Sequence, residues 1–170
     1  MTTREGLIAA IDALRAADSP VVVAISGYGG SGKSTLARAL LAEVPRSRLL
    51  SADDFLHEDR FEQRSPDWDV VDRDRLRAGL DAFRATAASG AVLLVEGVGI
   101  LHPTLADAFD LTVWMDVTLV TATLRGKARD HAAGNDHDRL WNDVWVPNER
   151  DFDARFSPRD AADVLYQAAG

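Results

Sequence analysis

Apolar residues along the chain follow two alternating patterns. Short apolar runs rich in β-branched residues predict strands that are covered on both faces, at residues 21–26, 91–96 and 111–116. Weaker runs at residues 48–52 and 162–166 predict two further strands. Glycine, proline or polar residues separate these runs from the segments that follow them.

Between the runs, apolar residues recur at every third or fourth position, as they do on one face of a helix. The first such segment follows Thr2 and Glu5, which have the spacing of a capping box, and it ends near residues 18–20. A polar, irregular stretch extends from the second strand to about residue 69, and a second polar break covers residues 133–138. The other predicted helices cover residues 33–44, 72–88, about 118–130, and the segment from the second break to about residue 152.

Strands that alternate with helices are typical of an α/β fold built on a parallel sheet. The chain has 170 residues and carries neither an internal repeat nor a long linker rich in glycine, serine or proline. We therefore expect a single domain over residues 1–170, with helices covering both faces of the sheet.

The charge balance narrows the range of partners. The chain has 19 basic and 27 acidic side chains, a net charge of −8, and no cysteine. The acidic balance argues against a nucleic-acid-binding surface, and the absence of cysteine excludes a disulfide framework, a thiolate zinc site and a cysteine nucleophile. The sequence shows neither a signal-peptide pattern at its start nor an apolar run of membrane-spanning length. We expect a cytoplasmic protein whose partners include neither nucleic acid nor a membrane.

A glycine-rich turn joins the first strand to the next helix and matches the phosphate-loop pattern G-x-x-x-x-G-K-[ST]. Glycines allow successive backbone N–H groups to surround phosphate oxygens, and the following helix N-terminus adds partial positive charge. Lys33, one of only two lysines in the chain, would reach the β- and γ-phosphates, and the Ser34 hydroxyl would be a ligand of Mg²⁺. The residues expected to hold the nucleotide are Gly27, Gly29, Gly30, Ser31, Gly32, Lys33, Ser34 and Thr35.

A second interpretation uses some of the same residues. Gly27, Gly29 and Gly32 also satisfy G-x-G-x-x-G, and Asp53 lies about 20 residues further on, where a dinucleotide-binding fold places its ribose-binding acid. That site has no use for the lysine and serine that end the phosphate-loop pattern. Binding of a dinucleotide remains the alternative.

Acidic residues follow two of the predicted strands, at the edge of the sheet where parallel strands bring ligands together. Glu96 ends an apolar strand and would support the water shell of Mg²⁺; the alternative is a solvated carboxylate at a strand end. Asp53 and Asp54 end the second strand, and successive side chains of an extended chain alternate in direction, so we expect one of them to face the site. We favour Asp53 as the base that accepts the proton of a substrate hydroxyl, with capping of the next loop as the alternative.

Two arginines lie on one face of the helix predicted at about residues 118–130. Arg125 and Arg129 are four residues apart, whereas Lys127 is on another side of the helix. Near a polar, glycine-containing break, these guanidinium groups are typical of a mobile lid that closes over phosphates. The alternative is a solvated basic face paired with Asp130.

In combination, these segments resemble the uridine kinase-like group of P-loop kinases, which also includes phosphoribulokinase-type enzymes. The resemblance implies a three-layer α/β sandwich, a parallel sheet of about five strands with helices on both faces, and a helical lid at about residues 125–140. It also implies ATP with Mg²⁺ and transfer of the γ-phosphoryl group to a hydroxyl. The resemblance rests, in this order along the chain, on the phosphate loop, Asp53-Asp54-Phe55, Val95-Glu96-Gly97-Val98, Arg125 with Arg129-Asp130, Pro147-x-Glu149 and Ala162-Asp163-Val164.

The resemblance also suggests roles for single residues. Asp53 matches the catalytic aspartate of that group, and Arg125 and Arg129 match its lid arginines. Trp68 and Asp69 lie where the group binds the sugar hydroxyls of the acceptor, with Asp72 as the alternative. Arg159, which follows a proline near the last strand, is a candidate neighbour of the adenine.

The acceptor is less well defined than the nucleotide. Leu56 stands where uridine kinases usually have a tyrosine, and the chain between Asp53 and Glu96 is too short for the hairpin that holds the pyrimidine base in that group. A uridine-like nucleoside is the expected small-molecule acceptor, with another small alcohol as the alternative. A nucleotide-binding regulatory protein without an acceptor site is the second functional hypothesis, and the sequence leaves the oligomeric state and the choice between ATP and GTP open.

Three tryptophans and four histidines remain to be interpreted. Trp114 is expected in the core, and Trp141 and Trp145, four apart on one helix, are expected to pack in the core or at the lid hinge rather than to stack on a base. His131 and His137 lie among aspartates in the predicted lid, which we interpret as a solvated hinge with a metal site as the alternative. His57 and His102 are expected to be structural or exposed.

Overall fold

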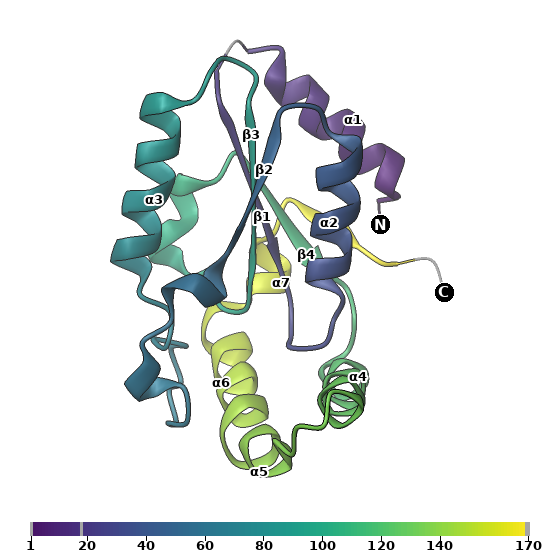
Figure 1. Cartoon of the computed structure of the whole chain (residues 1–170), viewed down its shortest axis with the longest axis vertical. Helices are drawn as coiled ribbons and strands as arrows, with labels where there is room; N and C mark the ends of the chain where they lie inside the picture. Colours follow the sequence, from purple (N-terminus) through teal and green to yellow (C-terminus); the bar gives the residue numbers. More distant parts are fainter. Residues whose placement is uncertain (1, 18, 169–170) are drawn as a thin grey trace.

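The computed structural model describes residues 2–17 and 19–168. Helices and strands alternate along most of this chain, and the central strands lie between helices on either side (Figure 1). In chain order the elements are α1 (Arg4–Arg15), β1 (Val21–Ser26), α2 (Lys33–Glu43), β2 (Ser47–Ser51), the 3-10 helices η1 (Ala52–Phe55) and η2 (Glu58–Arg60), α3 (Arg73–Thr86), β3 (Val92–Gly97), the 3-10 helix η3 (Pro103–Ala108), β4 (Leu111–Met115), α4 (Leu119–Ala132), α5 (Asp138–Leu140), the π-helix η4 (Trp141–Trp145), α6 (Val146–Phe156), α7 (Pro158–Ala161) and β5 (Val164–Tyr166).

The strands form one five-stranded sheet in the order β2-β3-β1-β4-β5. Every neighbouring pair is parallel, and β1 lies at the centre, paired with β3 on one side and β4 on the other. The predicted α/β fold with a parallel sheet of about five strands is confirmed. Because all strands run in the same direction, their carboxyl ends lie at one edge of the sheet, on the side of α4, α5 and α6 (Figure 1).

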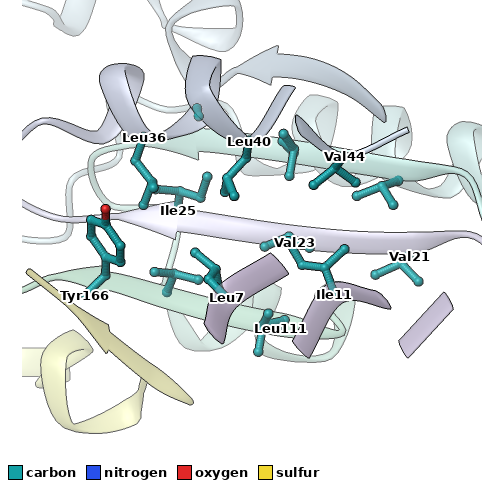
Figure 2. Packing of buried hydrophobic residues seen from close by; sticks show 14 of the residues in the cluster. Leu7, Ile11, Val21, Val23, Ile25, Leu36, Leu40, Val44, Leu111 and Tyr166 are labelled. Atoms are coloured by element: carbon teal, nitrogen blue, oxygen red, sulfur yellow. The ribbon is translucent and has the colours of Figure 1, made fainter. Parts of the chain in front are cut away.

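Alternation along β1 divides the core between the two faces of the sheet. Val21, Val23 and Ile25 point to the side of α1 and α2, where they pack with apolar residues of those helices (Figure 2). Val22 and Ala24 point to the opposite side, where α3 and part of α6 cover the sheet. Each of these five side chains is almost fully removed from water, which explains why the strand is apolar at every position.

The structure corrects several predicted boundaries at the ends of the chain. The N-cap of α1 is Thr3, whose hydroxyl accepts from the N–H of Gly6, and not Thr2, which forms a bridge to Tyr166 instead. Helix α1 ends at Arg15, earlier than predicted; of the predicted end at 18–20, residue 18 lies outside the described residues. Capping patterns locate a helix start only to within a residue or two, because adjacent threonines offer the same hydroxyl.

The helix after the second polar break also differs from the prediction. It extends to Phe156 rather than to about residue 152, and it contains the π-helical turn η4. A π turn rotates the following residues around the helix axis relative to an α-helix. Periodicity at 3.6 residues per turn therefore does not predict which side chains of α6 face the sheet.

Candidate active site

The glycine-rich loop crosses the carboxyl edge of the sheet between β1 and α2. Gly27, Gly30 and Gly32 have positive φ angles of 150°, 83° and 99°, a region that favours glycine. A Cβ atom on Gly30 would also collide with the carbonyl oxygen of Ala122 in α4. The loop thus requires glycine for its own turn and for its close contact with α4.

Lys33 is the first residue of α2, and only 7% of its surface is exposed to solvent. Its Nζ donates to the carbonyl oxygen of Tyr28 at 2.9 Å, so the side chain folds back along the loop. Burial lowers the pKa of the Lys33 ammonium, while the charges of Glu149, Glu96 and Asp53 oppose that effect. A cation held among three carboxylates at a glycine-rich turn is suited to bind a polyphosphate.

Glu96 connects the end of β3 to the loop and to β2. One carboxylate oxygen accepts from Ser34 Oγ at 3.1 Å, and the other accepts from Ser51 Oγ at 3.0 Å. Hydroxyl and carboxylate oxygens are hard ligands of the kind that Mg²⁺ prefers, so Ser34 and Glu96 fit the metal role expected of them. The expected alternative for Glu96, a solvated strand end, does not describe this residue, which is buried and bonded on both oxygens.

Asp53 lines the same cleft as Lys33 and Glu96, whereas Asp54 is not among the residues that line it. The backbone N–H of Asp53 donates to Ser51 Oγ at 3.3 Å, which holds the start of η1 against the end of β2. The surrounding protein desolvates the Asp53 carboxylate and raises its pKa, and the nearby charge of Glu96 raises it further. A carboxyl with a raised pKa beside an anion site is a candidate proton acceptor.

Helix α4 supplies two arginines to the lining of the cleft. Arg125 and Arg129 both line it, as their spacing predicts. Lys127 lies elsewhere on the helix, where its Nζ donates to Asn142 at 2.7 Å and pairs with Asp138 at 3.5 Å. The two arginines are the cationic groups that α4 places in the cleft.

Asp130 accepts hydrogen bonds both from Arg129 and from Trp141 in the π-helical turn η4. One of its oxygens accepts two hydrogen bonds from Arg129, at 3.0 and 2.8 Å, and the other accepts from the indole N–H of Trp141 at 2.9 Å. Burial would raise the pKa of Asp130, but hydrogen bonds from Trp141, Arg129 and His137 outweigh it and hold the pKa below its usual value. The expected pairing of the basic face with Asp130 is therefore present for Arg129, and it links the end of α4 to η4.

Trp141 packs directly on glycines of two elements. A Cβ atom on Gly29 would lie 2.9 Å from its ring, and one on Gly126 would lie 2.5 Å from it. Trp141 and Trp145 form an edge-to-face pair, and both line the cleft. Trp141 therefore packs between the glycine-rich loop and α4, and both tryptophans also line the cleft.

Glu149 lines the cleft, although sequence reasoning assigned no role to it beyond its place in the Pro147-x-Glu149 pattern. It lies on α6, 3% exposed, and its Oε1 accepts from the backbone N–H of Gly29 at 2.7 Å. Burial raises the pKa of its carboxyl to about 7, although the bond from Gly29 and the charge of Lys33 lower it. Because a π-helical turn precedes α6, helical periodicity does not predict that Glu149 faces the cleft.

The structure separates the residues expected at the acceptor and at the adenine. Trp68 lines the cleft, whereas Asp69 is not among its lining residues and instead bonds to Ser65 and Arg60. Arg159 also lies outside the lining, where its guanidinium bonds to Asp116 at 2.9 and 3.2 Å. The cleft has a volume of about 440 Å³. Its lining residues are Gly29, Gly30, Gly32, Lys33, Ser34, Thr35, Arg38, Asp53, Phe61, Trp68, Glu96, Gly97, Val98, Arg125, Arg129, Trp141, Trp145 and Glu149.

Similarity to known proteins supports the assignment of the fold. No protein-family model matches the chain. Among curated proteins, the uridine-cytidine kinase C of Dictyostelium discoideum is 27% identical over 119 residues, which is 56% of this chain. The match spans only 26% of the length of that relative.

Solved structures match over nearly the whole chain. A protein of Silicibacter sp. that is provisionally assigned as a fructose transport system kinase has a TM-score of 0.74 at 22% identity, covering 98% of this chain and 100% of the other. A protein of Bacillus stearothermophilus provisionally assigned as a uridine kinase has a TM-score of 0.62 at 16% identity, covering 94% and 98%. The shikimate kinase of Acinetobacter baumannii has a TM-score of 0.56 at 19% identity, covering 92% and 88%.

The chain is similar to the uridine kinase-like group of P-loop kinases. Its fold is the three-layer α/β fold of P-loop kinases, with the glycine-rich loop after the central strand. The helices α4 to α6 lie on the side of the carboxyl edge, and the lid expected at about residues 125–140 falls within this segment and stays a prediction. Within the described residues, no helix combines the length and the apolar character that crossing a membrane requires.

Proposed function

We propose that the protein is an ATP-dependent kinase that transfers the γ-phosphoryl group of Mg-ATP to a hydroxyl of a small molecule. The observation that carries this proposal is the convergence of Lys33, Asp53, Glu96, Arg125 and Arg129 on one cleft at the carboxyl edge of the sheet. A phosphate-binding protein needs the lysine, but a carboxyl poised as a base and two arginines on a separate helix are features of phosphoryl transfer. The similarity to P-loop kinases supports the same conclusion.

The residues divide the reaction between them. The loop amides and Lys33 bind the phosphates, and Arg125 and Arg129 stabilise the charge that develops on the transferred group. Ser34 and Glu96 would hold Mg²⁺, which neutralises phosphate charge when it is bound. Asp53 accepts the proton of the attacking hydroxyl, and its raised pKa makes it a stronger base than an exposed aspartate.

A nucleoside, uridine-like, is the acceptor we propose. The support is the aromatic surface of Phe61, Trp68 and Trp145, which lines the cleft together with Asp53. Aromatic side chains offer flat apolar faces on which a base or the apolar face of a sugar can stack. The chain between β2 and β3 is short, so the cleft can enclose only part of a nucleobase. The acceptor should therefore be tested with a broad panel of alcohols.

The test is a transfer assay with γ-labelled Mg-ATP and a panel of nucleosides, simple sugars and vitamin alcohols. Phosphorylation of uridine or cytidine would support the full proposal, and phosphorylation of another alcohol would support the kinase while replacing its acceptor. Slow ATP hydrolysis with every compound of the panel would contradict the kinase and support a nucleotide-dependent regulatory protein.

A further inference from the structure

The carboxylate of Glu149 lies against the glycine-rich loop, at a place where a phosphate oxygen could otherwise bind. Its Oε1 accepts from the Gly29 N–H at 2.7 Å, and a Cβ atom on Gly29 would lie only 3.0 Å from that oxygen. Its Oε2 is buried and has no hydrogen-bond partner among the residues that the structure describes. Burying a carboxylate oxygen without a hydrogen-bond donor costs free energy of folding. This oxygen is therefore either protonated or hydrogen-bonded to a ligand when one binds in the cleft.

The charged groups around Glu149 come from several elements. Lys33 of α2 faces it, and the Glu149 charge in turn helps to raise the pKa of Tyr28, after the larger effects of burial and of Asp153. Arg125 and Arg129 of α4 line the same cleft. No described side chain donates a hydrogen bond to Oε2, because Lys33 donates to the Tyr28 carbonyl oxygen instead.

The two remaining carboxylates of the cleft, Asp53 and Glu96, make the site more acidic. Both reinforce the charge of Lys33, and Glu96 is already bonded to Ser34 and Ser51. An incoming polyphosphate therefore meets a site that contains three carboxyl groups. Of these, Glu149 alone bonds to an amide of the loop within the described residues.

We propose that Glu149 is a proton-coupled ligand of the phosphate site, which occupies the loop as a built-in anion and takes up a proton when a nucleotide phosphate enters. This proposal rests on the proposed nucleotide binding and adds a residue and a linkage to it. A phosphate oxygen and an ionised carboxylate cannot share the Gly29 corner of the loop without strong repulsion in a buried site. Once protonated, the Oε2–H becomes a donor and can bond to a phosphate oxygen, so the same side chain changes from competitor to ligand.

The proton comes from the solvent, and its uptake makes nucleotide affinity depend on pH. A carboxyl with a pKa of about 7 is mostly protonated at pH 6 and about 10% protonated at pH 8. The dissociation constant of the nucleotide should therefore rise about tenfold from pH 6 to pH 8, because only the protonated fraction binds. Close to one proton should be taken up per nucleotide at pH 8.

The experiment measures binding of Mg-AMP-PNP by calorimetry at pH 6, 7 and 8, in two buffers of different ionisation enthalpy at each pH. The wild-type protein is compared with Glu149→Gln, which keeps an oxygen for Gly29 and has a permanent donor in place of the protonated oxygen. Glu43→Gln is the matched control, because Glu43 is an exposed residue at the far end of α2 that pairs with Arg4. The ionisation of the nucleotide itself is common to all three proteins and cancels in the comparison.

We expect the wild type and Glu43→Gln to lose about tenfold in affinity from pH 6 to pH 8 with proton uptake. Glu149→Gln should bind at pH 8 about as well as the wild type does at pH 6, and without that proton. An equal pH dependence in wild type and Glu149→Gln would overturn this inference and leave the kinase proposal standing. Absence of binding by the wild type at every pH would overturn both. If Glu149→Gln does not fold, as judged by circular dichroism, Glu149→Ala is measured against the same expectation of a pH-independent affinity.

Discussion

Replacing Gly126 by alanine should disrupt the contact between α4 and the π-helical turn that follows it. Gly126 is buried in the interior of α4, where alanine is favoured over glycine by about 1 kcal/mol in the absence of other contacts. The added Cβ would lie 2.5 Å from two carbons of the Trp141 ring, a distance that no relaxed contact allows. The indole must therefore move, and its movement also affects Gly29, on which it packs.

The size of the effect follows from these contacts. Forcing an additional carbon into a packed site costs about 1–3 kcal/mol. Displacing the indole also breaks the bond from Trp141 to the buried Asp130 carboxylate, a charged hydrogen bond of about 1.5–3 kcal/mol. After the gain in helix propensity is subtracted, we expect a net loss of about 1.5–5 kcal/mol in the free energy of unfolding and a fall in Tm of several degrees.

Thermal and urea unfolding measure this effect, with Gly79→Ala in α3 as the matched control. A Cβ on Gly79 would make only an ordinary contact at 3.7 Å with the Phe55 ring, so that variant should be stabilised by up to about 1 kcal/mol. The double variant Gly126→Ala/Trp141→Phe should recover the overpacking part of the loss, because the smaller ring leaves room for the methyl group. An increase in stability for Gly126→Ala equal to that for Gly79→Ala would refute the reasoning.

Three further predictions concern the cleft. Asp53→Asn should reduce the rate of transfer by about 10²–10⁴ while nucleotide binding changes little, and the wild-type rate should fall as the pH is lowered through the raised pKa of Asp53; a collapse of nucleotide affinity instead would contradict its role as the base. Glu96→Gln should weaken the binding of Mg²⁺, measured as a higher Mg²⁺ concentration for half-maximal transfer, because an uncharged amide replaces the carboxylate beside Ser34. Because the folded state raises the pKa of Glu149 to about 7, its contribution to stability is complete below the ordinary value of 4.5 and is lost as the pH rises through 7. Urea unfolding should therefore show that the wild type loses on the order of 3 kcal/mol relative to Glu149→Gln between pH 5 and pH 8, and parallel curves for the two proteins would contradict this.

The fold was largely predictable because its strongest signals are local. The runs at β1, β3 and β4 are short, apolar at almost every position and rich in β-branched residues, a pattern typical of strands in a sheet that is covered on both sides. The glycine-rich turn was equally clear, since three of its positions need positive φ angles. The N-cap at Thr3 and the end of the last long helix were missed, because cap choice and π turns depend on contacts that neighbouring residues do not encode.

The cleft could be predicted only in part, because some of its residues are placed by strand direction and others by tertiary packing. Lys33 and Glu96 lie at fixed positions after strands, so strand direction alone brings them to the same edge. Glu149 and Trp141 come from the segment after the lid break, and their positions depend on how that segment packs back on Gly29 and Gly126. Asp69 and Arg159 are polar residues near the cleft whose side chains pair with neighbours instead of lining it. Sequence spacing could not distinguish these cases.

Phosphoryl transfer by a matched pair of lysine variants is the most direct test of the proposed function. Lys33 and Lys127 are the two lysines of the chain; the first lines the cleft, and the second pairs with Asn142 and Asp138 outside its lining. With γ-labelled Mg-ATP and the acceptor that the panel identifies, Lys33→Ala should reduce transfer to background while Lys127→Ala keeps most of it, both variants being folded by circular dichroism. Undiminished transfer by Lys33→Ala would contradict the proposal that this cleft is a kinase active site.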